Sequence, residues 1–315
     1  MLLAKNNIVV FTVVVSCLLL VGVLSLEKTN TLKNVVPTMR GEVSLGKNIV
    51  ITTTKSHQPI LVKREDFFYG DQMRFSGSVK DIQSEIAKAL CKEGDTVVNI
   101  GAYFGYDALL MSERAGHTGK IYAFEENRQI YKCLKKTVVL NELEDRIIVK
   151  NLAILDKKGI CEVEDFLSGY QTEEGIVPPS TKFVAECNTL DNELKENVTK
   201  VDLMLIDEPG YEFAILNGAK EIISRSPNII IISYFERKLS ARNIDVKAEL
   251  DKFVDEGFRI YLTDDNGKMT EPGTSEIAAK DSGVLIITKQ LISNQNYSYD
   301  QKQEMEQQQQ TTEAK

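Results

Sequence analysis

The sequence predicts an α/β fold: a doubly wound, mostly parallel sheet with an antiparallel edge, behind an N-terminal membrane anchor. Three observations lead to this prediction. Short apolar strands alternate with amphipathic helices from residue 96 onward, which is typical of a parallel sheet covered by helices on both faces. The last two strand-like segments have no expected helix between them, as in an antiparallel pair. A run near the N-terminus carries no charge.

The charge-free run covers residues 8–26 (IVVFTVVVSCLLLVGVLSL). As a helix rising 1.5 Å per residue, a stretch of this length matches the hydrocarbon core of a bilayer, about 30 Å thick. The alternative is a cleaved signal peptide, whose apolar stretch is usually shorter, about 7 to 15 residues, and ends at a small-residue cleavage site. We therefore expect a signal anchor after a flank of residues 1–7, with the rest of the chain lumenal or extracellular. Cleavage would make the protein secreted.

Composition limits the function. The 315 residues are 43% hydrophobic and 27% charged, which excludes collagen-like, disulfide-framework and wholly disordered proteins. The net charge of −8 argues against a nucleic-acid partner, because neutralising phosphates requires a basic surface. His57 and His117 are the only histidines, which disfavours a His-rich metal site and a Ser/His/Asp triad. The four cysteines after the anchor are even in number, so disulfide pairing is permitted but not required: Cys91, Cys133, Cys161 and Cys187.

One large domain is expected between two polar ends. Residues 27–41 have the composition of a stalk, and residues 293–315, rich in Gln and charge, of a disordered tail. The domain then covers residues 42–292, with its core at 78–290.

The first half of the domain contains two β-prone segments, 48–54 and 59–62. A helix is expected at 78–90, because Ser78 can cap it and its apolar residues recur at helical spacing. The alternation then continues with strand 96–100, a glycine-bounded turn at 101–105, helix 107–114, strand 120–124, helix 127–140 and strand 147–154.

The second half resumes the alternation after a less regular stretch. Strand 201–206 precedes helix 212–224, whose Ile and Leu residues share one face. Residues 165–185 are polar and rich in Pro and Gly, so we expect either an acceptor-facing insertion or a solvated loop. The remaining elements are strand 228–233, helix 246–256 and strands 259–263 and 283–288.

Ligands of a doubly wound sheet lie outside the carboxyl ends of its strands. Residues 99–105 (NIGAYFG) follow the first strand of the alternation. Gly101 lets the backbone turn and a ligand approach, and Gly105 allows close packing where the next helix starts. A dinucleotide loop would have G-x-G-x-x-G, but position 103 is Tyr and a P-loop is also absent. A dinucleotide or nucleotide-sugar enzyme is therefore disfavoured.

Acidic residues follow two other strands. Glu125 ends a strand about twenty residues beyond the glycine loop, where an acid accepts hydrogen bonds from both ribose hydroxyls. S-adenosylmethionine has a ribose, no phosphates and a carboxylate suited to a helix N-terminus. Asp207 ends a central strand and Glu212 begins the next helix, so the pair could orient and deprotonate a substrate hydroxyl. Alternatively, Asp207 caps the turn and Glu212 complements the helix dipole.

Residues 94–234 resemble the FkbM-type family of S-adenosylmethionine-dependent methyltransferases. The resemblance implies a seven-stranded Rossmann-like methyltransferase fold, S-adenosylmethionine as the cofactor, and O-methylation of hydroxyls on sugars or other natural products. It further implies cofactor contacts from Asn99, Gly101, Ala102, Gly105 and Glu125, with Asp207 and Glu212 near the reaction centre. The segments that carry it are NIGAYFGYDALLMSERAG, IYAFEEN, LKKTVVLNEL, NLAILDKKG, NTLDNEL and LMLIDEPGYEFAILNGA, in that order.

Three residues depart from the family pattern. Asn99 stands where the family usually has Asp, so the charge that complements a sulfonium and an ammonium is lost. Pro209 displaces the acid that usually precedes the glycine, although Glu208 is adjacent, and Ser233 stands where an acid is expected. We therefore weigh two functions. The first is a membrane-anchored O-methyltransferase acting on a glycan or small molecule. The second is a catalytically inactive module of the same fold that binds or scaffolds at a membrane.

Overall fold

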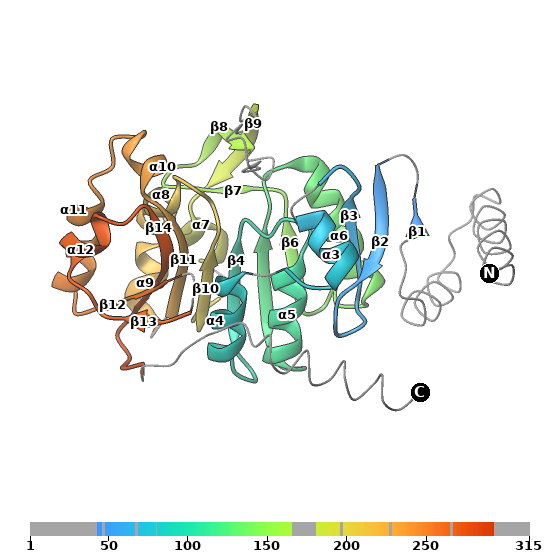
Figure 1. The fold of residues 1–315 in the computed structure, drawn as a ribbon, viewed down its shortest axis with the longest axis horizontal. Helices are drawn as coiled ribbons and strands as arrows, with labels where there is room; N and C mark the ends of the chain where they lie inside the picture. The colour runs from blue at the N-terminus through green and yellow to red at the C-terminus, as the bar shows by residue number, and fades with distance from the viewer. Residues whose placement is uncertain are drawn as a thin grey trace, which may run out of the picture.

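The central feature of the computed structural model is an eight-stranded sheet in the order β13–β12–β14–β11–β10–β4–β5–β6 (Figure 1). Strands β6, β5, β4, β10 and β11 run parallel to one another. The strands are β4 (Thr96–Ile100), β5 (Lys120–Phe124), β6 (Ile147–Lys150), β10 (Leu203–Ile206), β11 (Ile229–Phe235), β12 (Arg259–Thr263), β13 (Met269–Thr270) and β14 (Ser282–Thr288).

The structure describes residues 43–45, 48–66, 69–79, 81–165, 181–195, 198–226, 229–264 and 267–292. The expected anchor at 8–26, the stalk at 27–41 and the tail at 293–315 lie outside these ranges. Within them, every helix is too short or too polar to cross a bilayer.

The expected antiparallel edge of the sheet is confirmed, although it contains one strand more than predicted. β14 pairs antiparallel with both β11 and β12, so it lies inside the sheet, and the two-residue β13 forms the edge, antiparallel to β12. Burial explains the position of β14, because its last five residues are all buried and a strand that is apolar on both faces requires neighbours and cover. β13 also raises the strand count from seven to eight.

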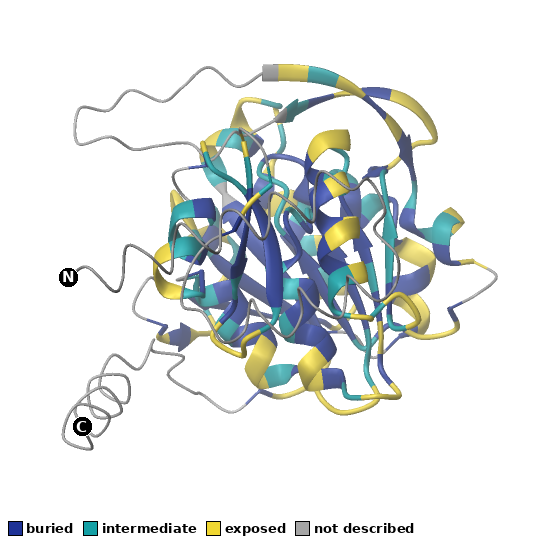
Figure 2. Cartoon of the chain, turned by 90° about the vertical axis from the view of Figure 1, so that its right-hand side faces the viewer, coloured by how far each residue is buried: buried dark blue, intermediate teal, exposed yellow. Residues whose placement is uncertain are grey.

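Helices cover both faces of the sheet, as a doubly wound fold requires. One face packs against α4 (Ile82–Leu90), α5 (Tyr106–Ala115) and α6 (Arg128–Leu140), which contribute to one hydrophobic core. In Figure 2 the strands are dark blue between helices whose outer sides are yellow. The second core contains residues of the remaining helices: α7 (Leu190–Leu194), α8 (Glu212–Asn217), α9 (Lys220–Arg225), α10 (Glu236–Ser240), α11 (Val246–Asp255) and α12 (Thr274–Ala278).

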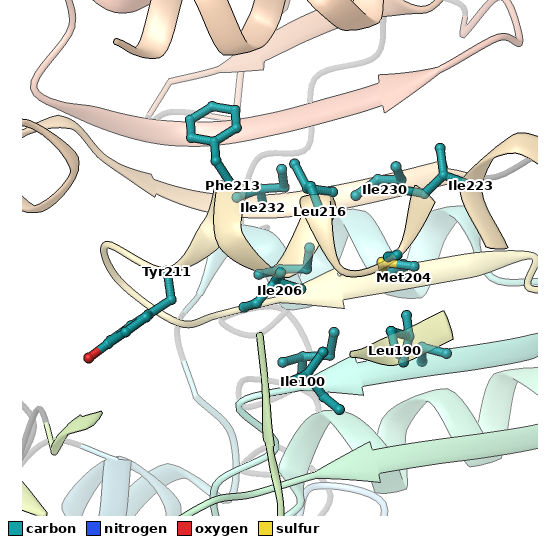
Figure 3. Packing of buried hydrophobic residues seen from close by; sticks show 14 of the residues in the cluster. Ile100, Leu190, Met204, Ile206, Tyr211, Phe213, Leu216, Ile223, Ile230 and Ile232 are labelled. Atoms are coloured by element: carbon teal, nitrogen blue, oxygen red, sulfur yellow. The ribbon is translucent and has the colours of Figure 1, made fainter. Parts of the chain in front are cut away.

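Figure 3 shows this second core, where helices α8 and α9 face strands β10 and β11. Tyr211 points away from the packed side chains, and its hydroxyl accepts a hydrogen bond from the backbone N–H of Glu164 (3.2 Å). The labelled partners that pack between helix and strand are Phe213, Leu216, Ile223, Met204, Ile206, Ile230 and Ile232.

Three expected elements differ from the sequence prediction by more than two residues or by a break. α4 starts at Ile82, because its cap is Asp81, whose side chain accepts the N–H of Gln83, and not Ser78. The expected helix 212–224 is two helices, because Gly218 packs against the carbonyl of Leu155, where a Cβ would lie only 2.0 Å away. The expected strand 147–154 is also divided, into β6 and a short strand of another sheet.

A small N-terminal sheet lies beside the main domain. Its strands β1 (Val43–Ser44), β2 (Ile49–Thr53) and β3 (Pro59–Lys63) are antiparallel. β3 contacts α6, where the hydroxyl of Thr137 accepts the N–H of Leu61 at 3.0 Å. Helix α3 (Tyr69–Ser76) follows β3.

A third sheet, β7–β9–β8, was not predicted. It consists of β7 (Ala153–Ile154), β8 (Gly159–Asp165) and β9 (Thr181–Asn188), with a disulfide between Cys161 and Cys187. Cys91 and Cys133 are buried and free. Both ends of the expected loop 165–185 are therefore strand, and its centre, residues 166–180, lies outside the described residues.

Candidate active site

The strand order brings the predicted site residues to one edge of the sheet. β5, β4, β10 and β11 are neighbours and run parallel, so the residues after each strand lie at the same carboxyl edge. Asn99 lies near the end of β4, and the glycine loop that ends at Gly105 follows. Glu125 and Asp207 directly follow β5 and β10, and Ser233 lies in the second half of β11.

The glycine loop packs directly against the segment after β10. Gly101 has a φ of +78°, and a Cβ there would lie 2.4 Å from the carbonyl oxygen of Asp207. The N–H groups of Gly101 and Ala102 both donate to the carbonyl of Phe124, at 3.1 and 2.9 Å. At Gly105 a Cβ would lie 2.6 Å from Leu134 on α6, which confirms that this glycine allows close packing. The backbone of Asp207 thus occupies the space that a side chain at position 101 would need.

Glu125 connects this loop to the next helix. Its carboxylate is buried and accepts the N–H of Tyr103 on one oxygen and the N–H of Asn127 on the other, both at 2.9 Å. Asn151 holds the segment in place by donating to the carbonyls of Glu125 and Glu126, at 2.8 and 2.9 Å. These contacts fix the carboxylate at the end of β5, and its role in holding the ribose hydroxyls stays a prediction.

The pKa of the Asp207 carboxyl lies close to neutral pH. Burial, and then the nearby Asp81, raise the pKa of Asp207 to about 7, while the hydroxyl groups of Ser233 and Tyr69 beside it lower that pKa. The hydroxyl of Tyr69, on α3, donates to Oδ2 at 3.3 Å. A carboxyl in this state can accept a proton at physiological pH.

Glu208 lies over the glycine loop. Its Oε1 is 3.0 Å from the position that a Cβ on Gly101 would occupy. Burial raises the pKa of Glu208 well above its ordinary value, and the neighbouring carboxylates of Glu126 and Glu125 raise it further. Several carboxyl groups therefore lie close together at this edge, and burial and mutual repulsion favour the protonated forms of Asp207 and Glu208. Among the described residues, its acids do not form a group that could hold a metal ion.

Glu212 lies on the other face of the sheet from the Asp207 side chain. Asp207 contacts Ser233, whose hydroxyl donates to Gln83 on α4 (2.6 Å). Glu212, which is buried at the start of α8, instead interacts electrostatically with Tyr234, and consecutive strand residues point to opposite faces. The structure therefore does not place the two carboxylates on one side, and the catalytic role of Glu212 stays a prediction.

Four polar residues near Asp207 were not predicted as site residues. Tyr69 gives no local signal, because it contacts Asp207 across 138 positions of the chain. Asp107 directly follows the glycine loop, and Asp81 caps α4, so both could have been found from helix-start patterns. Ser84 on α4 donates to Oδ1 of Asp107 at 2.6 Å and lies 3.4 Å from Oδ2 of Asp81.

The Thr189-Leu190-Asp191 triplet has a structural role. The Thr189 hydroxyl caps α7 by accepting the N–H of Asn192 at 3.2 Å. The carboxylate of Asp191 accepts the N–H groups of Glu221 and Ile222 at the start of α9, at 3.0 and 2.9 Å. The triplet therefore fixes two helix N-termini.

Known proteins are similar to this chain in sequence and fold. A tRNA (adenine(57)-N(1)/adenine(58)-N(1))-methyltransferase, TrmI, from Methanocaldococcus jannaschii is 26% identical over 182 residues, covering 57% of this chain. The alignment spans 56% of that relative. The chain thus spans about half the length of the curated relative it matches.

Solved structures of methyltransferases superpose partially. An O-methyltransferase from Bacillus cereus in complex with SAH matches with a TM-score of 0.42 and 15% identity, over 67% of this chain and 83% of that chain. The FkbM methyltransferase from Methylobacillus flagellatus matches with a TM-score of 0.38 and 13% identity, over 64% and 50%.

The family model for the methyltransferase FkbM domain matches residues 99–260. This match starts at Asn99, and it includes the glycine loop, Glu125, Asp207 and Glu212. It covers just over half of the chain, which therefore belongs to the FkbM methyltransferase family.

Proposed function

We propose that this protein is a membrane-anchored O-methyltransferase that acts on a hydroxyl of a glycan or small molecule. The observation that carries the proposal is Asp207, a carboxyl at the sheet edge with a pKa of about 7, a hydrogen bond from Tyr69 and the hydroxyl of Ser233 beside it. A general base with a pKa near the working pH is best suited to remove a hydroxyl proton.

S-adenosylmethionine is the cofactor of this family, and the site fits it. The cofactor has two positive charges, and the edge of the sheet presents the carboxyls of Glu125, Asp207 and Glu208. The buried amide nitrogen of Asn99 has no hydrogen-bond partner, so a donor is available for a ligand. Glu125 would hold the ribose. When bound, the cofactor supplies a methyl group on a sulfonium leaving group.

The residues of the chain then position the acceptor and move one proton. The hydrogen bond from Tyr69 orients the Asp207 carboxyl, and Ser233 lies beside it. Asp207 would take the proton of the acceptor hydroxyl at a carboxylate oxygen, which would leave the hydroxyl oxygen able to accept the methyl group that the cofactor would supply as its sulfonium sulfur leaves as a thioether. Holding the reacting atoms in line supplies most of the acceleration.

A cavity of about 220 Å³ is lined by residues of β8, α8 and α10 and of the segments beside them. Its wall includes Gly210, Tyr211, Phe213 and Arg242, and the guanidinium of Arg242 lies 3.8 Å from the centre of the Tyr211 ring. The cavity lies on the face of the sheet that Glu212 occupies and not on that of the Asp207 side chain, so it does not bring an acceptor to Asp207.

The disulfide supports the proposed location. A bond between Cys161 and Cys187 persists in secretory or extracellular compartments and is rare in a reducing cytosol. It agrees with an anchor at 8–26 that places the domain in a lumen or outside.

Two alternatives have specific motivations. Asn99, Pro209 and Ser233 favour an inactive module that only binds or scaffolds. The relative from Methanocaldococcus jannaschii acts on adenines of tRNA, but the net charge of −8 opposes a nucleic-acid acceptor.

The test is a transfer assay with the detergent-solubilised full chain and S-adenosylmethionine labelled in its methyl group. The acceptors are a panel of methyl hexosides and simple phenols, with unmodified tRNA in parallel. We expect label in one or more hydroxyl acceptors, and loss of that signal in Asp207→Asn. Label only in tRNA, or cofactor binding without transfer to any acceptor, would reject O-methylation in favour of one of the alternatives.

A further inference from the structure

The two acids Asp81 and Asp107 lie at the starts of α4 and α5, two helices that pack on the same face of the sheet. Asp107 lies in the first turn of α5, two residues after Gly105, and Asp81 caps α4. The hydroxyl of Ser84 joins them, at 2.6 Å from Asp107 and 3.4 Å from Asp81. Two carboxylates at the N-termini of adjacent helices are thus tied into one unit.

Asn99 points to the same face of the sheet. The strand partners of Asn99 on either side, Ala123 and Leu205, both belong to the core under α4 and α5, and paired strand residues share a face. Its amide nitrogen is buried, with 2% of the residue exposed, and has no hydrogen-bond partner. A buried donor without an acceptor costs free energy, which an incoming acceptor group would remove.

The charged groups with the largest effects on the pKa of Asp107 are acids. Burial raises the pKa of Asp107 to about 7, and the charged groups that shift it further are Asp81, Asp207 and Glu85, all acids. Burial also raises the pKa of Asp81. A cation placed among these groups would be attracted by several carboxylates at once in a poorly solvated site.

S-adenosylmethionine has two charged groups that complement these residues. Its amino-acid end has an ammonium, which suits the carboxylates, and a carboxylate, which suits the Asn99 amide and the N-terminus of α5. We propose that Asp107, supported by Asp81 and Ser84, binds the α-ammonium of S-adenosylmethionine and replaces the acid missing at position 99. The Asn99 amide donates to the α-carboxylate. This assignment rests on the use of S-adenosylmethionine by the proposed function.

Calorimetric titration of the solubilised full chain with two ligands tests the proposal. S-adenosylhomocysteine carries the ammonium, and its deaminated analogue keeps the adenosine, the thioether and the carboxylate. In Asp107→Asn we expect affinity for S-adenosylhomocysteine to fall at least tenfold, while affinity for the deaminated analogue stays within about twofold, because only the first ligand loses an ion pair. Asp81→Asn should show the same pattern more weakly.

Controls separate binding from folding. Asp245→Asn changes an equivalent acidic cap on α11 and should leave both affinities unchanged. Equal losses for both ligands in Asp107→Asn, or no loss for either, would overturn the assignment while leaving cofactor use intact. If Asp107→Asn does not fold, Asp81→Asn decides by the same criterion. A wild-type chain that binds neither ligand would overturn the proposed function together with this assignment.

Discussion

At the scale of single residues, the proposed chemistry depends on the environment of the Asp207 carboxyl. The Asp207 carboxyl is buried and lies near other acids, and both effects raise its pKa, to about 7. Tyr69 opposes that effect by donating a hydrogen bond, and the nearby hydroxyl of Ser233 also favours the ionised form. Asp207 is therefore poised between its protonated and ionised forms.

The first prediction concerns the pH dependence of methyl transfer. A base acts only when ionised, so the rate should rise about tenfold per pH unit well below pH 7 and level off above it, since the pKa of Asp207 is about 7. Asp207→Asn should lower kcat by about 10² to 10⁴-fold, the usual contribution of a positioned base. Affinity for S-adenosylhomocysteine should persist, and a variant with normal kcat would remove Asp207 from the mechanism.

The second prediction separates Tyr69 from Asp207. In Tyr69→Phe the hydrogen bond at 3.3 Å disappears, and because that bond lowers the pKa of Asp207, the midpoint of the pH–rate profile should move to higher pH. At pH 9 the variant should recover most of the wild-type kcat. A profile with an unchanged midpoint would show that the Tyr69 hydroxyl does not act through Asp207.

At the scale of elements, the position of the site depends on close contacts between strand-end segments. Gly101 → Ala would place a Cβ 2.4 Å from the Asp207 carbonyl at a φ of +78°. We expect a loss of about 3 kcal/mol or more in the free energy of unfolding, measured by urea denaturation.

Gly257→Ala is the matched control for this substitution. Gly257 also has a positive φ, +83°, but nothing lies within 4 Å of its Cβ position. The alanine should cost only the backbone strain, about 1 to 2 kcal/mol. Equal losses at the two glycines would mean that the contact between the loop and Asp207 does not constrain position 101.

The same contacts mark the limit of what the sequence predicts. Strands Thr96–Ile100, Lys120–Phe124 and Arg259–Thr263 agree with the prediction residue for residue, because short apolar runs between glycines and charges define them locally. The break at Gly218 depends on the distant carbonyl of Leu155, which no local pattern encodes.

The candidate site was predictable to a similar extent. Glu125 and Asp207 follow apolar strands, so the strand pattern alone places them at the carboxyl edge. Tyr69 comes from a helix outside the matched family domain, and its role arises only from the tertiary fold. Glu212 lies correctly at a helix start, but the opposite faces of the sheet separate its side chain from that of Asp207.

At the scale of the whole molecule, a mostly parallel sheet carries the site and a disulfide-linked sheet flanks it. Cys161 and Cys187 are 26 positions apart. The chain-entropy estimate for a loop of that length is about 3 to 4 kcal/mol, so Cys161→Ala with Cys187→Ala should lower the free energy of unfolding by about that amount.

Reduction should reproduce the effect of this double substitution in the wild type. Urea denaturation with and without a reductant measures both. If the reductant has no effect on the wild type, the cysteines are not paired in solution, and the argument for an oxidising compartment fails.

The central claim is that the carboxyl edge of the sheet binds S-adenosylmethionine through Glu125. Calorimetric titration of the full chain with S-adenosylmethionine, beside Glu125→Ala, tests it most directly. We predict saturable binding by the wild type and at least a tenfold weaker affinity in the variant, because the ribose hydroxyls lose their acceptor. Absence of binding by the wild type, or equal affinity in Glu125→Ala, would contradict the claim.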